Sequence, residues 1–162
     1  MKSKRVNQFK VLYEIAKEIN SSLDADQVLN AIVESTTKTI GAKGCSLMLL
    51  SPDRKQLVHT IACGLSDWYL RKGPVKADAA ISKALQGNPV LIADVSTDAR
   101  IQYREQAAKE GIASILSIPI HLSDEVIGIL RIYTSAPRQF SSEEIDFLEA
   151  VANLGAIALE KA

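Results

Sequence analysis

One arginine stands out among the residues that could do chemistry, because it lies inside an apolar segment. Residues 113–134 predict a β-hairpin, and Arg131 lies in its second strand, two positions before Tyr133. Side chains alternate between the faces of a strand, so Arg131 and Tyr133 share one face. The guanidinium could hold an anionic ligand group at the floor of a pocket, or it could pair with a carboxylate at the rim of the sheet. The sequence leaves the register of the hairpin open, and with it the residues of the first strand that join Arg131.

Other polar and aromatic side chains lie in the irregular middle of the chain, where contacts to a ligand are expected. We predict a ligand-binding set formed by Trp68, Tyr69, Asp94, Arg100, Tyr103, Ser117, Arg131 and Tyr133. Asp94 and Asp98 could equally cap turns or the next helix. Arg131 and Tyr133 should point toward the middle helices, beside residues 64–72 and Asp94.

The remaining reactive side chains do not form a catalytic or metal-binding pattern. The two histidines, His59 and His121, fall short of the four ligands that zinc requires, and each is better interpreted as a partly exposed strand residue than as a haem ligand. Cys45 and Cys63 should lie diagonally on paired strands, as buried and inert thiols rather than as a redox switch. The sequence has neither a nucleophile with its base nor a phosphate-binding glycine loop. We therefore predict no enzymatic activity and leave any cofactor unidentified.

Composition and charge exclude several classes of partner. The 162 residues fit one domain with a sizeable core, and 19 basic residues balance 19 acidic ones, so no net charge attracts nucleic acid or an anionic membrane. No apolar run reaches the ~18 residues of a membrane span, and no signal peptide is found. Two cysteines are too few for a secreted disulfide framework, which favours a cytoplasmic protein.

Periodicity and end signals predict the elements that must position these residues. Helical spacing runs through the first 20 residues, and a second helix starts at Asp24, where Gln27 completes a capping box. The last helix starts in the same way, with Ser141 as the cap and Glu144 completing the box. Between them we expect a hairpin of residues 45–50 and 56–63, a helix at 79–86, a strand at 89–93, a helix at 102–110 and the hairpin of 113–134.

This order of elements predicts an α+β fold. Hairpins favour a central antiparallel β-sheet, and the terminal helices can cover one of its faces. The short helices and loops of the middle would cover the other face only in part. Partial coverage of a sheet leaves room for a small-molecule ligand pocket.

The two terminal helices are each apolar on two sides. In the last helix, Ile145 and Leu148 belong to one apolar stripe, and Val151 and Leu154 belong to the other. The second stripe has no partner within the chain except the N-terminal helix, so a monomer would expose an apolar patch. We therefore expect a homodimer in which the N- and C-terminal helices of two chains pack as a bundle. The double substitution Val151→Glu with Leu154→Lys should then yield folded monomers.

Three segments together resemble the GAF domain family. Residues 114–120 (SILSIPI), followed by 126–130 (VIGIL), are similar to the last hairpin of the family. Residues 88–95 (NPVLIADV) with Asp98-Ala99-Arg100 resemble its middle strand and loop, and residues 140–144 (FSSEE) resemble the start of its final helix. The resemblance covers roughly residues 20–160 and implies a GAF-like, PAS-related architecture.

Departures from the family pattern leave the ligand unnamed. The Asn-Lys pair of cyclic-nucleotide-binding members, the Cys-His pair that attaches bilins and the three cysteines of members that reduce free methionine sulfoxide are all missing. The resemblance still implies a sensory domain that binds a small molecule and relays a signal through a dimer. We expect a dimerisation and signalling helix at 1–20 and the GAF domain at 21–162, with a kinase, cyclase or transcription-factor output domain in a longer chain.

Two other functions stay open. The chain could be a dimerisation and relay module with a collapsed, ligand-free pocket. It could also be a GAF-type methionine sulfoxide reductase, although the number of cysteines argues against this.

Overall fold

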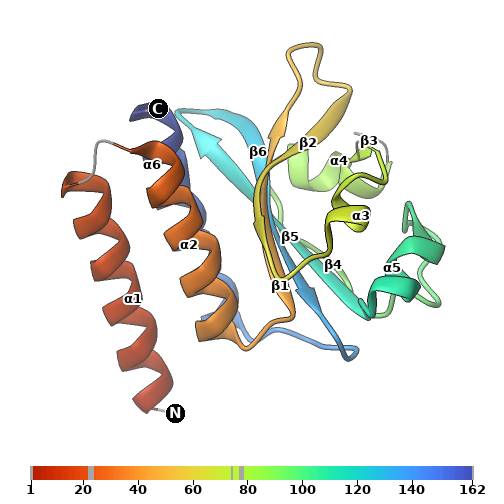
Figure 1. Ribbon diagram of the computed structural model, residues 1–162, viewed down its shortest axis with the longest axis horizontal. Coiled ribbons are helices and arrows are strands. Elements are labelled where there is room, and N and C mark those ends of the chain that lie inside the picture. Colours follow the sequence, from red (N-terminus) through yellow and green to blue (C-terminus); the bar gives the residue numbers. More distant parts are fainter. Residues whose placement is uncertain (1, 22–23, 74, 77–78, 162) are drawn as a thin grey trace.

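An antiparallel sheet forms the centre of the molecule (Figure 1). The computed structural model describes residues 2–21, 24–73, 75–76 and 79–161. The six strands of this described part are β1 Gly44–Leu50, β2 Gln56–Cys63, β3 Val75–Lys76, β4 Val90–Ile92, β5 Ser114–Leu122 and β6 Glu125–Thr134. Their order across the sheet is β3-β2-β1-β6-β5-β4. Both predicted hairpins are confirmed, and they meet where β1 pairs with β6.

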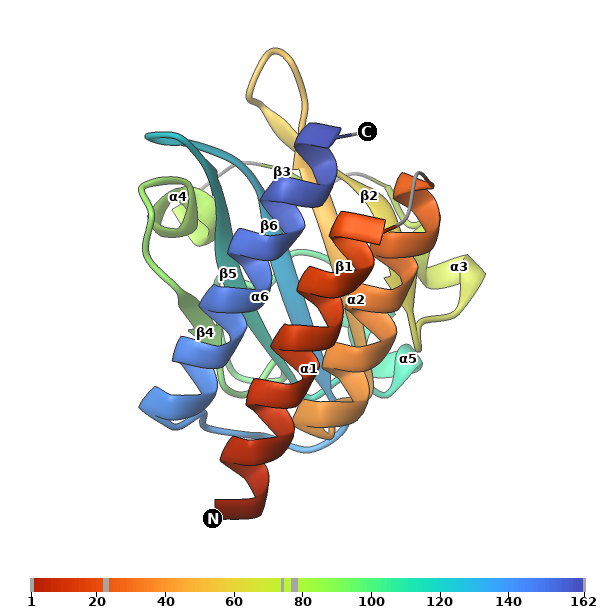
Figure 2. The same ribbon diagram turned by 90° about the vertical axis from the view of Figure 1, so that its left-hand side faces the viewer.

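Helices α2 (Ala25–Ile40) and α6 (Ser142–Lys161) cover one face of the sheet, as predicted (Figures 1 and 2). Leu148 and Val151 of α6 are fully buried in one cluster with Ile32 of α2 and Leu116 of β5. Val151 is therefore a core residue and not part of an exposed dimer stripe. The expectation that Val151→Glu would leave the fold intact is wrong, because a charge at this position would be buried without a partner.

The N-terminal helix forms an outer layer on these two helices. Helix α1 (Lys2–Ser21) runs alongside α2 and α6 and contacts both (Figure 2). Ile15 and Ile19 face inward and are buried, whereas Phe9 and Tyr13 are 76% and 63% exposed. The second apolar stripe of α6 therefore packs against α1 of the same chain. The apolar side chains that remain exposed in this layer belong mainly to α1.

Short helices lie on the opposite face, on the far side of the sheet from α2 (Figure 1). They are α3 (Asp67–Leu70), α4 (Ala79–Leu85) and α5 (Arg104–Glu110). The sequence predicts α4, α5 and β4 to within two residues at each end. It does not predict α3 or β3, because four and two residues are too few to show a period.

The start and end of α2 follow from its sequence signals. Asp24 Oδ1 accepts hydrogen bonds from the backbone N–H groups of Asp26 at 3.1 Å and Gln27 at 3.4 Å. Gly41 ends the helix in the left-handed conformation, with a φ of 72°. The Gln27 side chain does not complete the predicted capping box, because it donates instead to Glu18 Oε1 of α1 at 3.5 Å.

The start of α6 is fixed more firmly. Ser141 Oγ accepts from the Glu144 N–H at 3.1 Å, and Glu144 Oε1 accepts from the Ser141 N–H at 3.0 Å, so this capping box is complete. Arg138 donates to Glu144 Oε2 at 2.6 Å and to the carbonyl oxygen of Ile40 at 2.9 Å. Arg138 therefore ties the end of α2 to the start of α6.

Candidate functional site

A row of polar side chains crosses the centre of the sheet. The strand register pairs Arg131 of β6 with Ser46 of β1 on one side and with Ser117 of β5 on the other. Ile115 pairs with Tyr133, so the register that the sequence left open puts Ile115 and Ser117 on the face of Arg131. The two flanking serines are small, and they leave room for the long arginine side chain between them.

Arg131 is a buried cation with a neutral hydrogen-bond partner. The residue is 5% exposed, its Nε donates to Ser117 Oγ at 3.3 Å, and its guanidinium carbon lies 5.8 Å from the centre of the Tyr133 ring. Arg131 forms no ion pair with any carboxylate of the described residues. Thr36 Oγ1 is the one enclosed polar side-chain atom without a partner in that part of the chain. The terminal nitrogens of Arg131 must therefore reach space that water can enter.

Two tyrosines pack beside this guanidinium. Tyr133 and Tyr69 of α3 are both fully buried, and their rings meet edge to face with centres 6.2 Å apart. The Tyr133 hydroxyl lies 3.2 Å from Ser46 Oγ, within hydrogen-bond distance. Burial raises the pKa of the Tyr69 phenol, the neighbouring Tyr133 raises it further, and the positive charge of Arg131 opposes both effects. Arg131 and Tyr133 thus point toward the middle helices beside residues 64–72, as predicted.

A second cation lies on the same face. Lys72 Nζ lies 3.9 Å from the centre of the Tyr69 ring and 5.3 Å from that of the Tyr103 ring. Burial, and secondly repulsion from Arg131, lower the pKa of Lys72 to about 8. Two basic side chains therefore act on each other across an aromatic cluster.

Asp94 and Arg100 form local contacts. Asp94 Oδ1 accepts from the N–H of Ser96 at 2.9 Å and from its hydroxyl at 2.6 Å. Arg100 forms an ion pair with Asp98 at 2.6 Å. These hydrogen bonds hold the pKa values of both aspartates below their usual range. The turn-capping alternative is correct for Asp94 and Asp98. The position expected for Asp94 beside Arg131 stays a prediction, and no hydrogen bond of the described residues links the two.

Trp68 and Tyr103 lie at the margin of the cluster. Trp68 is 40% exposed, and Lys109 Nζ lies 4.9 Å from the centre of its ring. Tyr103 starts α5 with a left-handed φ of 50°, and its hydroxyl lies 2.8 Å from where a Cβ of residue 73 would stand. Residue 73 is a glycine with a φ of 124°, so a larger residue there would strain the backbone and would displace the Tyr103 hydroxyl.

Sequence reasoning missed Ser46, Lys72 and Glu110. Alternation along β1 could have placed Ser46 on the face of Met48, and Lys72 lies in the stretch already noted for its aromatic residues. Glu110 is a buried carboxylate whose Oε2 accepts from the Ser66 N–H at 2.6 Å, where α3 begins. Glu110 and Ser66 are 44 positions apart, so no pattern of neighbouring residues in the sequence could have predicted their contact.

The two thiols lie directly opposite each other and not diagonally. A bulge between Leu47 and Met48 shifts the pairing of β1 with β2, so that Cys45 and Cys63 become register partners. Both thiols are free. Cys45 is fully buried, which raises its pKa, and Cys63 Sγ donates to the carbonyl oxygen of Val33 at 3.3 Å. The prediction of a buried thiol is confirmed for Cys45, whereas Cys63 is half-buried. These contacts support the interpretation of both as inert thiols.

Metal ligation and membrane insertion find no basis in the residues that the structure describes. No group of three His, Cys, Asp or Glu side chains gathers among them. None of their helices has the length and apolar character to cross a bilayer. His121 on β5 is half-buried, as expected, whereas the side chain of His59 lies outside the described part.

Comparisons with known proteins agree on one family. The model of the GAF domain family matches residues 24–159. A methyl sulfide methyltransferase-associated sensor of Methanosarcina acetivorans is 28% identical over 153 residues, which cover 90% of this chain and 15% of that protein. A Nif-specific regulatory protein of Herbaspirillum seropedicae is 27% identical over 151 residues, which cover 88% and 28%. The chain therefore spans less than a third of the length of these curated relatives.

Solved structures show the same fold. The GAF domain of a phosphoenolpyruvate-protein phosphotransferase from Coxiella burnetii matches with a TM-score of 0.83 and 25% identity, over 96% of this chain and 94% of that one. The free methionine-R-sulfoxide reductase of Neisseria meningitidis matches with a TM-score of 0.77 over 95% and 89%, but at 16% identity it shares the fold alone. Since the family model covers most of the sequence, this chain belongs to the GAF domain family.

Proposed function

We propose that this chain is a non-enzymatic sensory domain of a cytoplasmic signalling protein. It binds a small molecule on the sheet face of Arg131 and relays the signal through the terminal helices of a homodimer. The observation that carries the proposal is the buried cation of Arg131, which has one neutral hydrogen-bond partner among the described residues. Burial of a charge costs free energy unless the charge is paired. Without a ligand, Arg131 would therefore lower the stability of the fold. The sensor and the regulatory protein among the relatives support a signalling role.

A path for the relay runs from Tyr133 to the covering helices. The N–H of Lys43, two residues after the C-terminal cap of α2, donates to the carbonyl oxygen of Tyr133 at 2.8 Å. Strand β6 then continues through the link that contains Arg138, which bonds to Ile40 of α2 and to Glu144 of α6. A ligand that moves Tyr133 would therefore act on α2 and α6 together.

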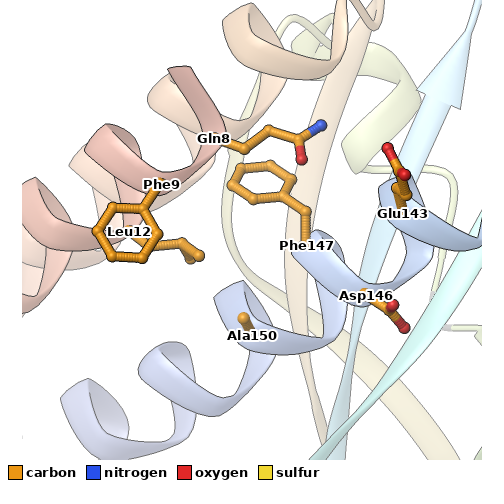
Figure 3. A pocket seen from close by; sticks show the side chains of 7 residues that line it. All are labelled: Gln8, Phe9, Leu12, Glu143, Asp146, Phe147 and Ala150. Carbon is orange, nitrogen blue, oxygen red and sulfur yellow. The ribbon is translucent and has the colours of Figure 1, made fainter. Parts of the chain in front are cut away.

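The surface for a second copy is the outer side of the helical layer. Phe9 and Tyr13 of α1 are exposed, and Ile157 of α6 is 44% exposed. A groove of about 330 Å³ lies between α1 and α6, with Phe9 and Leu12 on one side and Phe147 and Ala150 on the other (Figure 3). Large apolar side chains beside such a groove suit helix packing between two copies.

In this proposal the first 20 residues form the dimerisation and signalling helix, and residues 21–162 form the sensory GAF domain. A kinase, cyclase or transcription-factor output domain receives the signal elsewhere in a longer chain. The great length of the curated relatives compared with this chain supports such an arrangement.

A specific observation favours a ligand-free relay module as the second candidate. Apolar side chains fill the same face of the sheet on one side of Arg131, among them Met48, Leu57, Ile81 and Ile129. Reductase chemistry has less support, because a reactive cysteine needs a stabilised thiolate and burial raises the pKa of Cys45.

Native mass spectrometry of freshly purified protein tests the sensory proposal. The wild-type chain should retain a small molecule, Arg131→Met should lose it, and Arg100→Met should keep it, because Arg100 is a half-exposed arginine paired with Asp98. A wild-type chain that retains nothing, and whose Tm no compound of a metabolite panel raises, would instead identify the ligand-free relay module.

A further inference from the structure

We infer that two copies of this chain dimerise in parallel, with helix α1 of each copy packed into the groove between α1 and α6 of the other. The inference rests on the homodimer of the proposed function, and it names the surface and the direction of that dimer.

The first step concerns the groove and its apolar lining. Two adjoining cavities of about 330 Å³ and about 370 Å³ lie between α1 and α6, and Phe9, Leu12 and Ala150 line both of them (Figure 3). Because the cavities share these residues, they form one groove along the two helices. Phe9 and Tyr13 are 76% and 63% exposed at its edge. The groove and the large apolar side chains that fit a matching groove therefore lie on one surface, as a two-fold interface requires.

The second step concerns the charges beside the groove. Asp146 and Glu149 are exposed acidic residues of α6, and Lys10 is an exposed basic residue of α1. Lys10 lines the space between α1 and α2, so it lies on the side of α1 that is turned away from its own α6. None of these three side chains forms a hydrogen bond or an ion pair with another of the described residues. Their charges are therefore available for complementary pairing with a second copy.

The third step concerns the direction of the second copy. Phe9 of α1 and Asp146 of α6 line the same cavity, so they lie at the same level along the two parallel helices (Figure 2). Around a two-fold axis that runs along the helices, equal residues of the two copies also lie at equal levels. The partner's Lys10 then lies at the level of Asp146 and Glu149, where opposite charges attract. In an antiparallel dimer centred on the same groove, Glu14 would lie there instead and would repel them.

Cysteine cross-linking tests the direction. Phe9 and Asn20 are exposed and lie on one stripe of α1, about 16 Å apart along the helix. In a Cys63→Ser background, Phe9→Cys and Asn20→Cys should each form disulfide-linked dimers on mild oxidation, because a parallel dimer brings each residue close to its own copy. Sedimentation first finds a concentration at which each variant is a dimer, and Tyr13→Cys replaces Phe9→Cys if the latter stays monomeric. The Cys63→Ser chain without a new cysteine is the control.

Charge reversal tests the pairing. Lys10→Glu and Asp146→Lys should each raise the Kd of the dimer by about tenfold, because symmetry breaks each exposed pair twice. The double variant exchanges the two signs and restores the attraction, so its Kd should return to near the wild-type value. Lys83→Glu makes the same change of charge on α4, at the opposite face of the sheet, and should keep the wild-type Kd. Analytical ultracentrifugation measures each Kd.

The other outcomes overturn the inference. An axis perpendicular to the helices passes near only one of two residues 16 Å apart, so a cross-link at one position alone would show an antiparallel dimer. Cross-links at neither position, a wild-type Kd in both single variants, or a double variant no better than either of them would place the interface elsewhere. In these cases the homodimer of the proposed function still stands. A wild-type chain that stays monomeric would refute that homodimer as well, whereas native mass spectrometry tests the retention of a small molecule independently.

Discussion

Among single residues, Lys72 offers a direct test of the electrostatics of the cluster. Burial first, and the charge of Arg131 second, lower its pKa from 10.5 to about 8. Between about pH 8 and 10.5 Lys72 therefore binds more protons in the unfolded chain than in the folded chain, and its contribution to the free energy of unfolding rises with pH across this window. Burial raises the pKa of the Tyr69 phenol above its usual 10.0, so Tyr69 opposes this rise from about pH 10, where the phenol of the unfolded chain loses its proton.

Lys72→Met should raise the free energy of unfolding at pH 7 by on the order of 1 kcal/mol, an estimate that allows for solvent screening of a partly buried group. Methionine keeps the apolar contact with Tyr69 and removes the charge. It should also flatten the pH profile above pH 8. Urea unfolding at several pH values measures both effects, and Lys109→Met, at the surface beside Trp68, serves as the control. A wild-type slope in Lys72→Met would contradict this account.

The site also shows what single residues reveal in a sequence. Arg131 and Tyr133 could be assigned to one face, because alternation in a strand is a local rule. Their meeting with Lys72 and Tyr69 could not be predicted, since it depends on the path of the chain between residues 64 and 76. Asp94 and Arg100 look the same in sequence whether they bind a ligand or hold a turn, and the structure shows that Ser96 and Asp98 are their partners.

At the scale of elements, the capping box of α6 is the strongest local signal. Ser141→Ala should lower the free energy of unfolding by about 1 kcal/mol, because the Glu144 N–H loses its acceptor. Ser142→Ala, at the exposed neighbouring position, should change it by a few tenths of a kcal/mol. Urea unfolding of the two variants under the same conditions makes the comparison. Equal losses would show that the hydroxyl of Ser141 does not cap the helix.

Elements with strong end signals or clear periods could be predicted, and those that depend on distant contacts could not. Both hairpins and the capped helices α2 and α6 carry their signals within a few residues. The order of the strands, the two short elements α3 and β3, and the position of α1 depend on packing between distant segments. The bulge at Leu47 and Met48 is likewise invisible in sequence, and it moved Cys63 opposite Cys45.

At the scale of the whole molecule, the exposed apolar side chains of the helical layer predict the oligomeric state. Light scattering should give about twice the chain mass of 17.6 kDa. Phe9→Glu with Ile157→Lys should yield folded monomers, because both side chains are exposed and their charges would stay in water. This pair replaces the substitution at Val151, which lies in the core.

Val58→Glu is the matched control for the dimer. Val58 is an exposed apolar residue of β2, away from the terminal helices, and its substitution should leave the dimer intact. Analytical ultracentrifugation and circular dichroism of the three proteins separate dissociation from unfolding. A wild-type chain that stays monomeric at high concentration would refute a dimer through these helices.

The parallel directions of α1 and α6 determine how neighbouring domains would be arranged in a longer chain. Both helices have 20 residues and run in the same direction, so the two ends of the chain lie at opposite ends of the helical layer (Figures 1 and 2). A helix of this length spans about 30 Å. Segments joined to the two termini would therefore leave in opposite directions and be strung in line along one axis. In a dimer whose two chains run parallel, the domains before this one would lie at one end and the domains after it at the other. This domain would then connect the two sets of domains.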